Sequence, residues 1–271
     1  MNAENDGVAI HYDVHGSGRP VVLIHGFPDT GRLWQNQVEA LSGAGFQVIV
    51  PDLRGYGRSD KPTAVEQYNL LFLAGDIGAV LDAAGIQRAH VVGHDWGAAL
   101  AWVIGAMAPE RVDHLVALSV GHPATFRSDG FEQFEKSWYM LLFQFEGVAE
   151  QWLSKDDWAN FRAWGRHPDA DGVIADLEAN GSLTPGLNYY RANIPPESYV
   201  GDPLELPPVQ APTMGVWSTG DMALTEGQMT RSAQNVAGPW RYERVDGPGH
   251  WLQLEAPARV NKLLLDFLPA D

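Results

Sequence analysis

The stretch AHVVGHDWGAAL, residues 89–100, decides how this chain folds and where its chemistry lies. Residues 89–92 indicate a short buried strand, and residues 98–108, which stop at a proline, indicate a helix. The GHDWG segment between them predicts a tight turn from strand to helix, in which the two glycines allow close passage of the backbone. Such a turn pushes its central residue, Asp95, out at the carboxyl end of the sheet, where α/β folds bind ligands.

Strands and helices alternate on both sides of this turn. Short apolar runs predict buried strands at residues 21–25, 47–50, 89–92, 112–120, 213–217 and 240–245. The spacing of apolar residues predicts helices at residues 33–41, 71–84, 98–108 and 260–268. Because strands that are separated by helices pair in parallel, the sequence predicts an α/β fold with a mostly parallel sheet and helices on both faces.

One long segment interrupts this alternation. Aromatic-rich, helix-like pieces such as residues 134–145 follow residue 122, and Gly and Pro interrupt them until the strands resume. The simplest organisation is a core domain made of residues 1–122 and 209–271, with a helical cap (lid) domain of residues 123–208 inserted between two strands.

The composition of the 271 residues excludes several classes of protein. There is no cysteine, so disulfides, thiolate metal sites and a cysteine nucleophile are excluded. Lys and Arg number 18 against 34 Asp and Glu, and the net charge of −16 repels nucleic acid. No stretch approaches the roughly 18 apolar residues of a membrane span, and residues 1–7 lack the pattern of a secretory signal. We expect a cytoplasmic protein, a monomer or homodimer, with no nucleic-acid or membrane partner.

The aspartate at the centre of the turn selects the reaction. A carboxylate is ionised at pH 7 and can displace a leaving group at a saturated carbon, whereas a serine at this position would suit an acyl carbon. The product of that displacement is an ester between Asp95 and the substrate. A second step must then hydrolyse this ester with water.

Ester hydrolysis needs a base and a group that orients it. His250 lies in the segment GPGHW, residues 247–251, between the last predicted strand and the last helix. Asp221 follows the predicted strand at residues 213–217, so it stands between nucleophile and base in chain order, as expected for the acid. We expect His250 to activate water, while Asp221 holds the imidazole in the correct tautomer and stabilises its charged form.

The oxyanion that forms when water attacks the ester needs backbone N–H donors. One donor is expected from Trp96, the residue after the nucleophile. The other is expected from the segment HGFP, residues 25–28, after the first predicted strand. Phe27 is the candidate there, because Pro28 has no N–H.

Six segments spread over nearly the whole chain carry a family resemblance. They are HGFPDTGRLW (25–34), PDLRGYGRSDKP (51–62), VGHDWGA (92–98), FQFEGVAE (143–150), LNYYR (187–191) and GPGHWLQLEAP (247–257). These segments resemble the α/β-hydrolase superfamily and, within it, the soluble epoxide hydrolases. The resemblance implies an α/β-hydrolase fold, an aspartate nucleophile with an Asp–His pair, and two lid tyrosines that donate hydrogen bonds to the epoxide oxygen.

The resemblance places the two tyrosines at Tyr139 and Tyr190, and the choice of Tyr190 over Tyr189 depends on the resemblance alone. Opening an epoxide creates an alkoxide, a strong base, which neutral phenols with a pKa near 10 can protonate at pH 7. The carboxylate and the tyrosines cover both halves of the chemistry without a metal or cofactor. The resemblance therefore implies a cofactor-independent epoxide hydrolase that converts a small apolar epoxide into a vicinal diol.

A substrate pocket is expected around the nucleophile, formed by Phe27, Pro28, Trp96, Trp138, Phe143 and Trp251. Two other functions stay open. A haloalkane dehalogenase resembles this chain in fold and nucleophile, but Phe27 offers a halide no side-chain donor, and fluoroacetate dehalogenases place Arg where Trp96 stands. A non-catalytic ligand receptor would keep the fold, although an intact nucleophile, base and acid argue against it.

Overall fold

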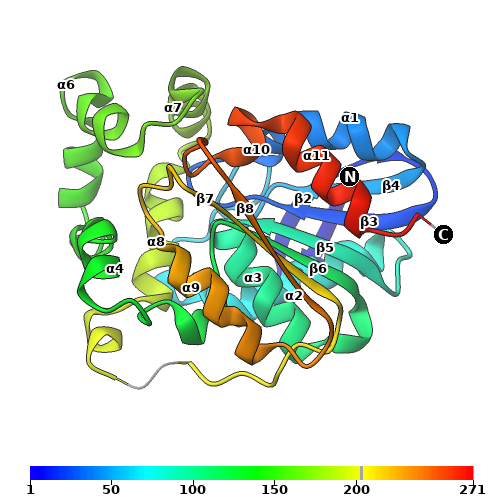
Figure 1. The fold of residues 1–271 in the computed structure, drawn as a ribbon. Helices are drawn as coiled ribbons and strands as arrows, with labels where there is room; N and C mark the ends of the chain where they lie inside the picture. The colour runs from blue at the N-terminus through cyan, green and yellow to red at the C-terminus, as the bar shows by residue number, and fades with distance from the viewer. Residues whose placement is uncertain (202–203, 271) are drawn as a thin grey trace.

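The computed structural model describes residues 1–201 and 204–270, and its centre is an eight-stranded sheet with the order β1-β2-β4-β3-β5-β6-β7-β8 (Figure 1). The strands are β1 (Asn2–Asn5), β2 (Val8–Gly16), β3 (Arg19–Ile24), β4 (Phe46–Pro51), β5 (Ala89–His94), β6 (Val112–Leu118), β7 (Thr213–Ser218) and β8 (Trp240–Val245). The six strands β3 to β8 pair in parallel, which confirms the predicted fold class. All carboxyl ends of these strands therefore meet at one edge.

Helices cover both faces of the sheet (Figure 1). The helices of the sheet region are α1 (Gln35–Gly43), α2 (Leu70–Ala83), α3 (Trp96–Met107), α9 (Glu226–Thr230), α10 (Leu252–Glu255) and α11 (Pro257–Phe267). Along β3, Val21 and Leu23 belong to the apolar core under α1 and α11, whereas Val22 and Ile24 belong to the core under α2 and α3. This alternation shows why the strands read as continuous apolar runs.

The first two strands form an antiparallel hairpin that the sequence analysis did not predict. Asp6 and Gly7 connect them with φ angles of 49° and 76°, the two left-handed residues of a tight hairpin turn. The signal was present, since an Asp-Gly pair precedes a segment that alternates apolar and polar residues.

The segment between β6 and β7 is helical, as predicted, and lies at one end of the sheet (Figure 1). Its α-helices are α4 (Phe131–Lys136), α5 (Tyr139–Leu142), α6 (Val148–Gly165), α7 (Ala170–Asn180) and α8 (Leu183–Asn193), called the lid helices below. Non-helical backbone at residues 155–158 kinks α6. The division of the chain into core and cap domains stays a prediction.

Short 3₁₀ turns complete the described structure. They are η1 (Gly31–Trp34), η2 (Val65–Tyr68), η3 (Pro109–Arg111), η4 (Pro123–Thr125), η5 (Pro196–Tyr199) and η6 (Arg231–Asn235). Across residues 1–201 and 204–270, none of the helices combines the length and the apolar character that crossing a bilayer requires.

Candidate active site

Asp95 alone turns the chain from β5 into α3. Its backbone has φ 53° and ψ −123°, a strained conformation for a residue with a side chain. A Cβ atom on Gly93 would lie 2.0 Å from the carbonyl oxygen of Gly97, and one on Gly97 would lie 2.0 Å from that of Ile24. Both glycines are therefore required by close backbone approach, as the sequence predicts, and the side chain of Asp95 is directed to the carboxyl end of the sheet.

The loop after β3 receives one carboxylate oxygen of Asp95. The backbone N–H of Phe27 donates to Asp95 Oδ1 at 2.8 Å. A Cβ atom on Gly26 would lie 2.3 Å from the same oxygen and 2.6 Å from the amide nitrogen of Trp96. A side chain at position 26 would therefore collide with both the carboxylate and the Trp96 amide, so only glycine lets the Phe27 N–H, one of the two predicted oxyanion donors, reach the Asp95 carboxylate.

His25 fixes this loop, a role that sequence reasoning did not give it. The ring is fully buried, and burial lowers its pKa, so the imidazole is neutral. Its Nε2 accepts a hydrogen bond from the N–H of Leu53 at 2.9 Å, which leaves Nδ1 to donate to the carbonyl of Gly26 at 3.0 Å. The HG pair could have indicated this, because a histidine directly before the oxyanion loop can brace it from inside the core.

The structure brings His250, Asp221 and Asp95 together from the ends of three strands. His250 Nδ1 lies 2.9 Å from Asp221 Oδ2, and His250 Nε2 lies 3.5 Å from Asp95 Oδ2. The second oxygen of Asp221 accepts hydrogen bonds from the backbone N–H groups of Ala223 at 2.8 Å and Leu224 at 2.9 Å. All three catalytic candidates are buried, so little water screens their interaction.

The two carboxylates control the charge of the imidazole. Burial alone would lower the pKa of His250, but the charges and hydrogen bonds of Asp221 and Asp95 raise it to about 10. Burial alone would likewise raise the pKa of Asp221, but the charge of His250 and the hydrogen bonds it accepts lower it. At neutral pH the site therefore contains an imidazolium between two carboxylates.

The backbone of His250 is held by two residues that sequence reasoning missed. His94 Nε2 donates to the carbonyl oxygen of His250 at 2.9 Å, and the hydroxyl of Ser119 donates to the same oxygen at 3.0 Å. Burial lowers the pKa of His94 to about 4, so this ring is neutral. Their places at the ends of β5 and β6 were the available signal, since strand ends of a parallel sheet share one edge.

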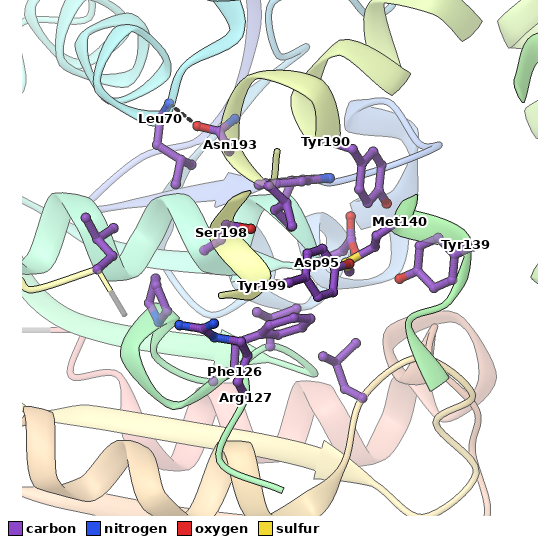
Figure 2. A pocket seen from close by; sticks show the side chains of 18 residues that line it. Leu70, Asp95, Phe126, Arg127, Tyr139, Met140, Tyr190, Asn193, Ser198 and Tyr199 are labelled. Carbon is purple, nitrogen blue, oxygen red and sulfur yellow. Dashed lines mark hydrogen bonds between the residues drawn. The ribbon is translucent and has the colours of Figure 1, made fainter. Parts of the chain in front are cut away.

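Tyr139 on α5 and Tyr190 on α8 face Asp95 from the lid (Figure 2). Their ring centroids lie 6.0 Å apart, and both side chains are buried. Burial, and then the charge of Asp95, raise the pKa of each phenol well above its usual value, so both are neutral donors. Tyr189 points elsewhere, because its hydroxyl donates to the carbonyl of Arg54 at 2.7 Å. This contact distinguishes Tyr189 from Tyr190, which the sequence alone could not do.

Two cavities meet at these residues, and Asp95, Tyr139 and Tyr190 line both of them. The larger has a volume of about 180 Å³ and a mainly apolar wall that includes Leu70, Trp96 and Met140 (Figure 2). The smaller has a volume of about 20 Å³. Its wall also includes Phe27, Pro28, Phe161, Trp164, Met222, His250 and Trp251.

Two of the predicted pocket residues lie elsewhere. Trp138 is 45% exposed and packs edge-on against Trp152 on the outer side of the lid, with ring centroids 5.7 Å apart. Phe143 is fully buried behind the tyrosines, with its ring 5.3 Å from that of Tyr139 and 5.0 Å from that of Tyr190. Adjacent residues of a helix point in different directions, so proximity to Tyr139 in the sequence did not place Trp138 at the cavity.

Comparisons with known proteins agree with this geometry. The family model described as the alpha/beta hydrolase fold matches residues 19–257. Epoxide hydrolase A of Mycobacterium tuberculosis is 34% identical, over 93% of this chain and 91% of that protein, and epoxide hydrolase 3 of Xenopus tropicalis is 31% identical, over 100% and 77%. The crystal structure of a Bacillus megaterium epoxide hydrolase in complex with an inhibitor superposes with a TM-score of 0.89 at 28% identity, over 98% of this chain and 99% of that one.

Proposed function

Because this chain belongs to the epoxide hydrolase family of the α/β-hydrolase superfamily, we propose that it converts small apolar epoxides into vicinal diols through an ester on Asp95. One observation carries the proposal. Asp95 binds the Phe27 N–H through one oxygen and faces His250 with the other, while two buried neutral phenols stand opposite. The proposed nucleophile (Asp95), base (His250) and two proton donors (Tyr139 and Tyr190) thus lie around the place where the two cavities meet.

Ring opening comes first. Asp95 Oδ2, the oxygen that Phe27 does not hold, forms a bond to one ring carbon as the bond from that carbon to the epoxide oxygen breaks. Tyr139 or Tyr190 donates its proton to the departing oxygen. The ester has no charge, so one of the two carboxylates that raise the pKa of His250 is lost. His250 then releases its proton, which restores the tyrosine.

Hydrolysis of the ester follows. Neutral His250, oriented by Asp221, takes a proton from water, and the hydroxide adds to the carbonyl carbon of the Asp95 ester. The oxygen that becomes negative is Oδ1, which accepts the hydrogen bond of the Phe27 N–H, and the Trp96 N–H is the proposed second donor. When the intermediate collapses, the proton of the added hydroxyl passes to the departing diol oxygen, so the Asp95 carboxylate and the His250 imidazolium are restored.

Incubation with styrene oxide and, separately, with 1-bromobutane tests the proposal. We expect diol from the epoxide and no bromide from the haloalkane. His250→Gln should form the ester without hydrolysing it, so intact-mass spectrometry should find protein enlarged by the mass of one epoxide. Bromide release without diol would make the protein a dehalogenase, and ligand binding without turnover would make it a receptor.

A further inference from the structure

Two side chains separate the smaller cavity from a groove on the surface. Trp164 and Met222 line the smaller cavity, and both also line an open groove of about 580 Å³ on the outer side of the lid. Trp164 lies near the end of the kinked α6, and Met222 follows Asp221 directly in the chain. The two side chains, called the rear wall here, are therefore a partition with the active site on one face and solvent on the other.

The position of this wall limits what can occupy the site. A volume of about 20 Å³ holds about one water molecule. His250 and Asp95 border that space, so it is where water must lie to attack the ester. The larger cavity, with about 180 Å³ and an apolar wall, has room for a hydrocarbon substituent. The two cavities thus provide one place for a substituent and one place for water.

The shape of an epoxide makes the difference in size between the two cavities important for which substrates fit. With the ring between Asp95 and the two phenols, the substituents on the two carbons of a trans-disubstituted epoxide extend in opposite directions, one toward each cavity. A group on the second carbon would displace the water and contact the rear wall. A terminal epoxide has only hydrogen on that carbon and fits without conflict.

We propose that Trp164 and Met222 close the site on the His250 side and so restrict the substrates to epoxides whose second ring carbon carries no bulky group. This inference rests on the proposed function. Truncating the rear wall should join the smaller cavity to the outer groove, and the closed end would become a passage through which a second substituent can extend.

The two members of the wall differ in what else they contact. The Trp164 ring packs on that of Tyr139, with centroids 4.6 Å apart, so truncating it also disturbs a catalytic candidate. Met222 is half-buried, and the nearby hydrogen bonds to Asp221 come from the backbone of residues 223 and 224. Met222→Ala is therefore the cleaner variant, and Trp164→Leu is the second.

Two isomers provide the test, because 1,2-epoxyoctane and trans-4,5-epoxyoctane have the same formula and differ only in where the ring lies. We expect the unaltered enzyme to favour the terminal isomer by about 100-fold or more in kcat/KM, since one misplaced methylene alone can cost about 10- to 200-fold. Met222→Ala should lower this ratio at least about tenfold, and Trp164→Leu should lower it as well.

Met140→Ala is the matched control. Met140 lines the larger cavity, follows Tyr139 as Met222 follows Asp221, and loses the same atoms on truncation. Its truncation enlarges only the larger cavity and leaves the rear wall in place, so it should not lower the ratio, whatever it does to the rate. The inference would be overturned by comparable rates on both isomers in the unaltered enzyme. It would also be overturned if both wall variants kept the ratio of the unaltered enzyme while circular dichroism showed them to be folded. In either case, diol formation would still uphold the proposed function. Diol from neither isomer nor from styrene oxide would instead overturn the proposed function.

Discussion

The two halves of the site are built in different ways. On the core side, Asp95, His250 and Asp221 stand at or just beyond the ends of β5, β8 and β7, so the sheet itself fixes their spacing. On the lid side, Tyr139 and Tyr190 stand on two helices whose positions depend on packing. The difference teaches that the ends of the strands position the proposed nucleophile, base and orienting acid, whereas packing between the helices of the lid positions the proposed proton donors and the walls of the cavities.

The largest effect should come from the core half. Asp95→Ala removes the group placed to form the ester, and we expect diol formation to fall by about 10⁴-fold or more, as when a nucleophile is deleted. Steady-state assays with styrene oxide would measure this, with thermal melting to show that the variant is folded. Activity within tenfold of the unaltered enzyme would mean that the strand ends do not carry the chemistry.

The lid half should respond next. Tyr139→Phe and Tyr190→Phe each remove one proton donor, and the double variant should lose about 10²- to 10⁴-fold in the rate of ring opening. Tyr189→Phe is the control, because its hydroxyl donates to the backbone of Arg54 and not to the cavity. Single-turnover measurement of ester formation would compare the rate of ring opening in these variants and in the Tyr189→Phe control. Ring opening that depends on Tyr189 and not on Tyr190 would reverse the assignment.

The pH dependence of stability tests the charge of His250 in the core half. The pKa of His250 is raised from 6.5 to about 10 in the folded protein, so its stabilising contribution is complete below pH 6.5 and lost as pH rises toward 10. The free energy of unfolding of the unaltered protein should therefore fall relative to that of His250→Gln over this range, by an amount on the order of a few kcal/mol. Urea titrations at pH 6, 8 and 10 would measure it. If the free energy of unfolding of the unaltered protein instead rose with pH relative to that of His250→Gln, His250 would not be protonated in the folded protein.

One buried carboxylate joins the two halves. Asp29 accepts a hydrogen bond from Trp251 Nε1 at 2.9 Å, next to His250, and lies 3.2 Å from His167 Nε2 in the segment between α6 and α7. Burial alone would raise the pKa of Asp29, but the charge and hydrogen bond of His167 lower it. The lid is thus attached to the loop that carries His250, the proposed catalytic base.

Removing this connection should have an intermediate effect. Asp29→Ala leaves two buried donors without a partner, which costs about 1–3 kcal/mol of stability for each buried group. Because the lid and the base lose a shared anchor, we expect kcat/KM to fall about tenfold. Arg32→Ala is the control, since its ion pairs with Asp169 and Asp176 also join core and lid but are exposed and worth little. Equal losses in both variants would show that the buried contact has no special role.

Sequence reasoning succeeded where a local rule applied. The GHDWG turn predicts the position of Asp95 because each glycine is required by backbone within 2.0 Å of where a side chain would begin. The fold class followed from the alternation of apolar runs. The size of the two cavities and the place of Trp164 and Met222 in the wall of the smaller one could not be predicted, because residues almost 60 positions apart in the chain meet there only through the docking of α6.

The smallest effect should come from Trp138, which the sequence predicts in the pocket and which lies outside it in the structure. Trp138 is 45% exposed and contacts Trp152, not the cavities. Trp138→Ala should therefore change kcat/KM for styrene oxide by no more than about twofold, because surface substitutions away from special contacts usually cost within ~0.5 kcal/mol. Phe143→Ala is the informative counterpart. Its ring supports both tyrosines from behind, so its loss should lower the rate of ring opening although it lines neither cavity. If Trp138→Ala had the larger effect, the outer face of the lid would have to take part in binding.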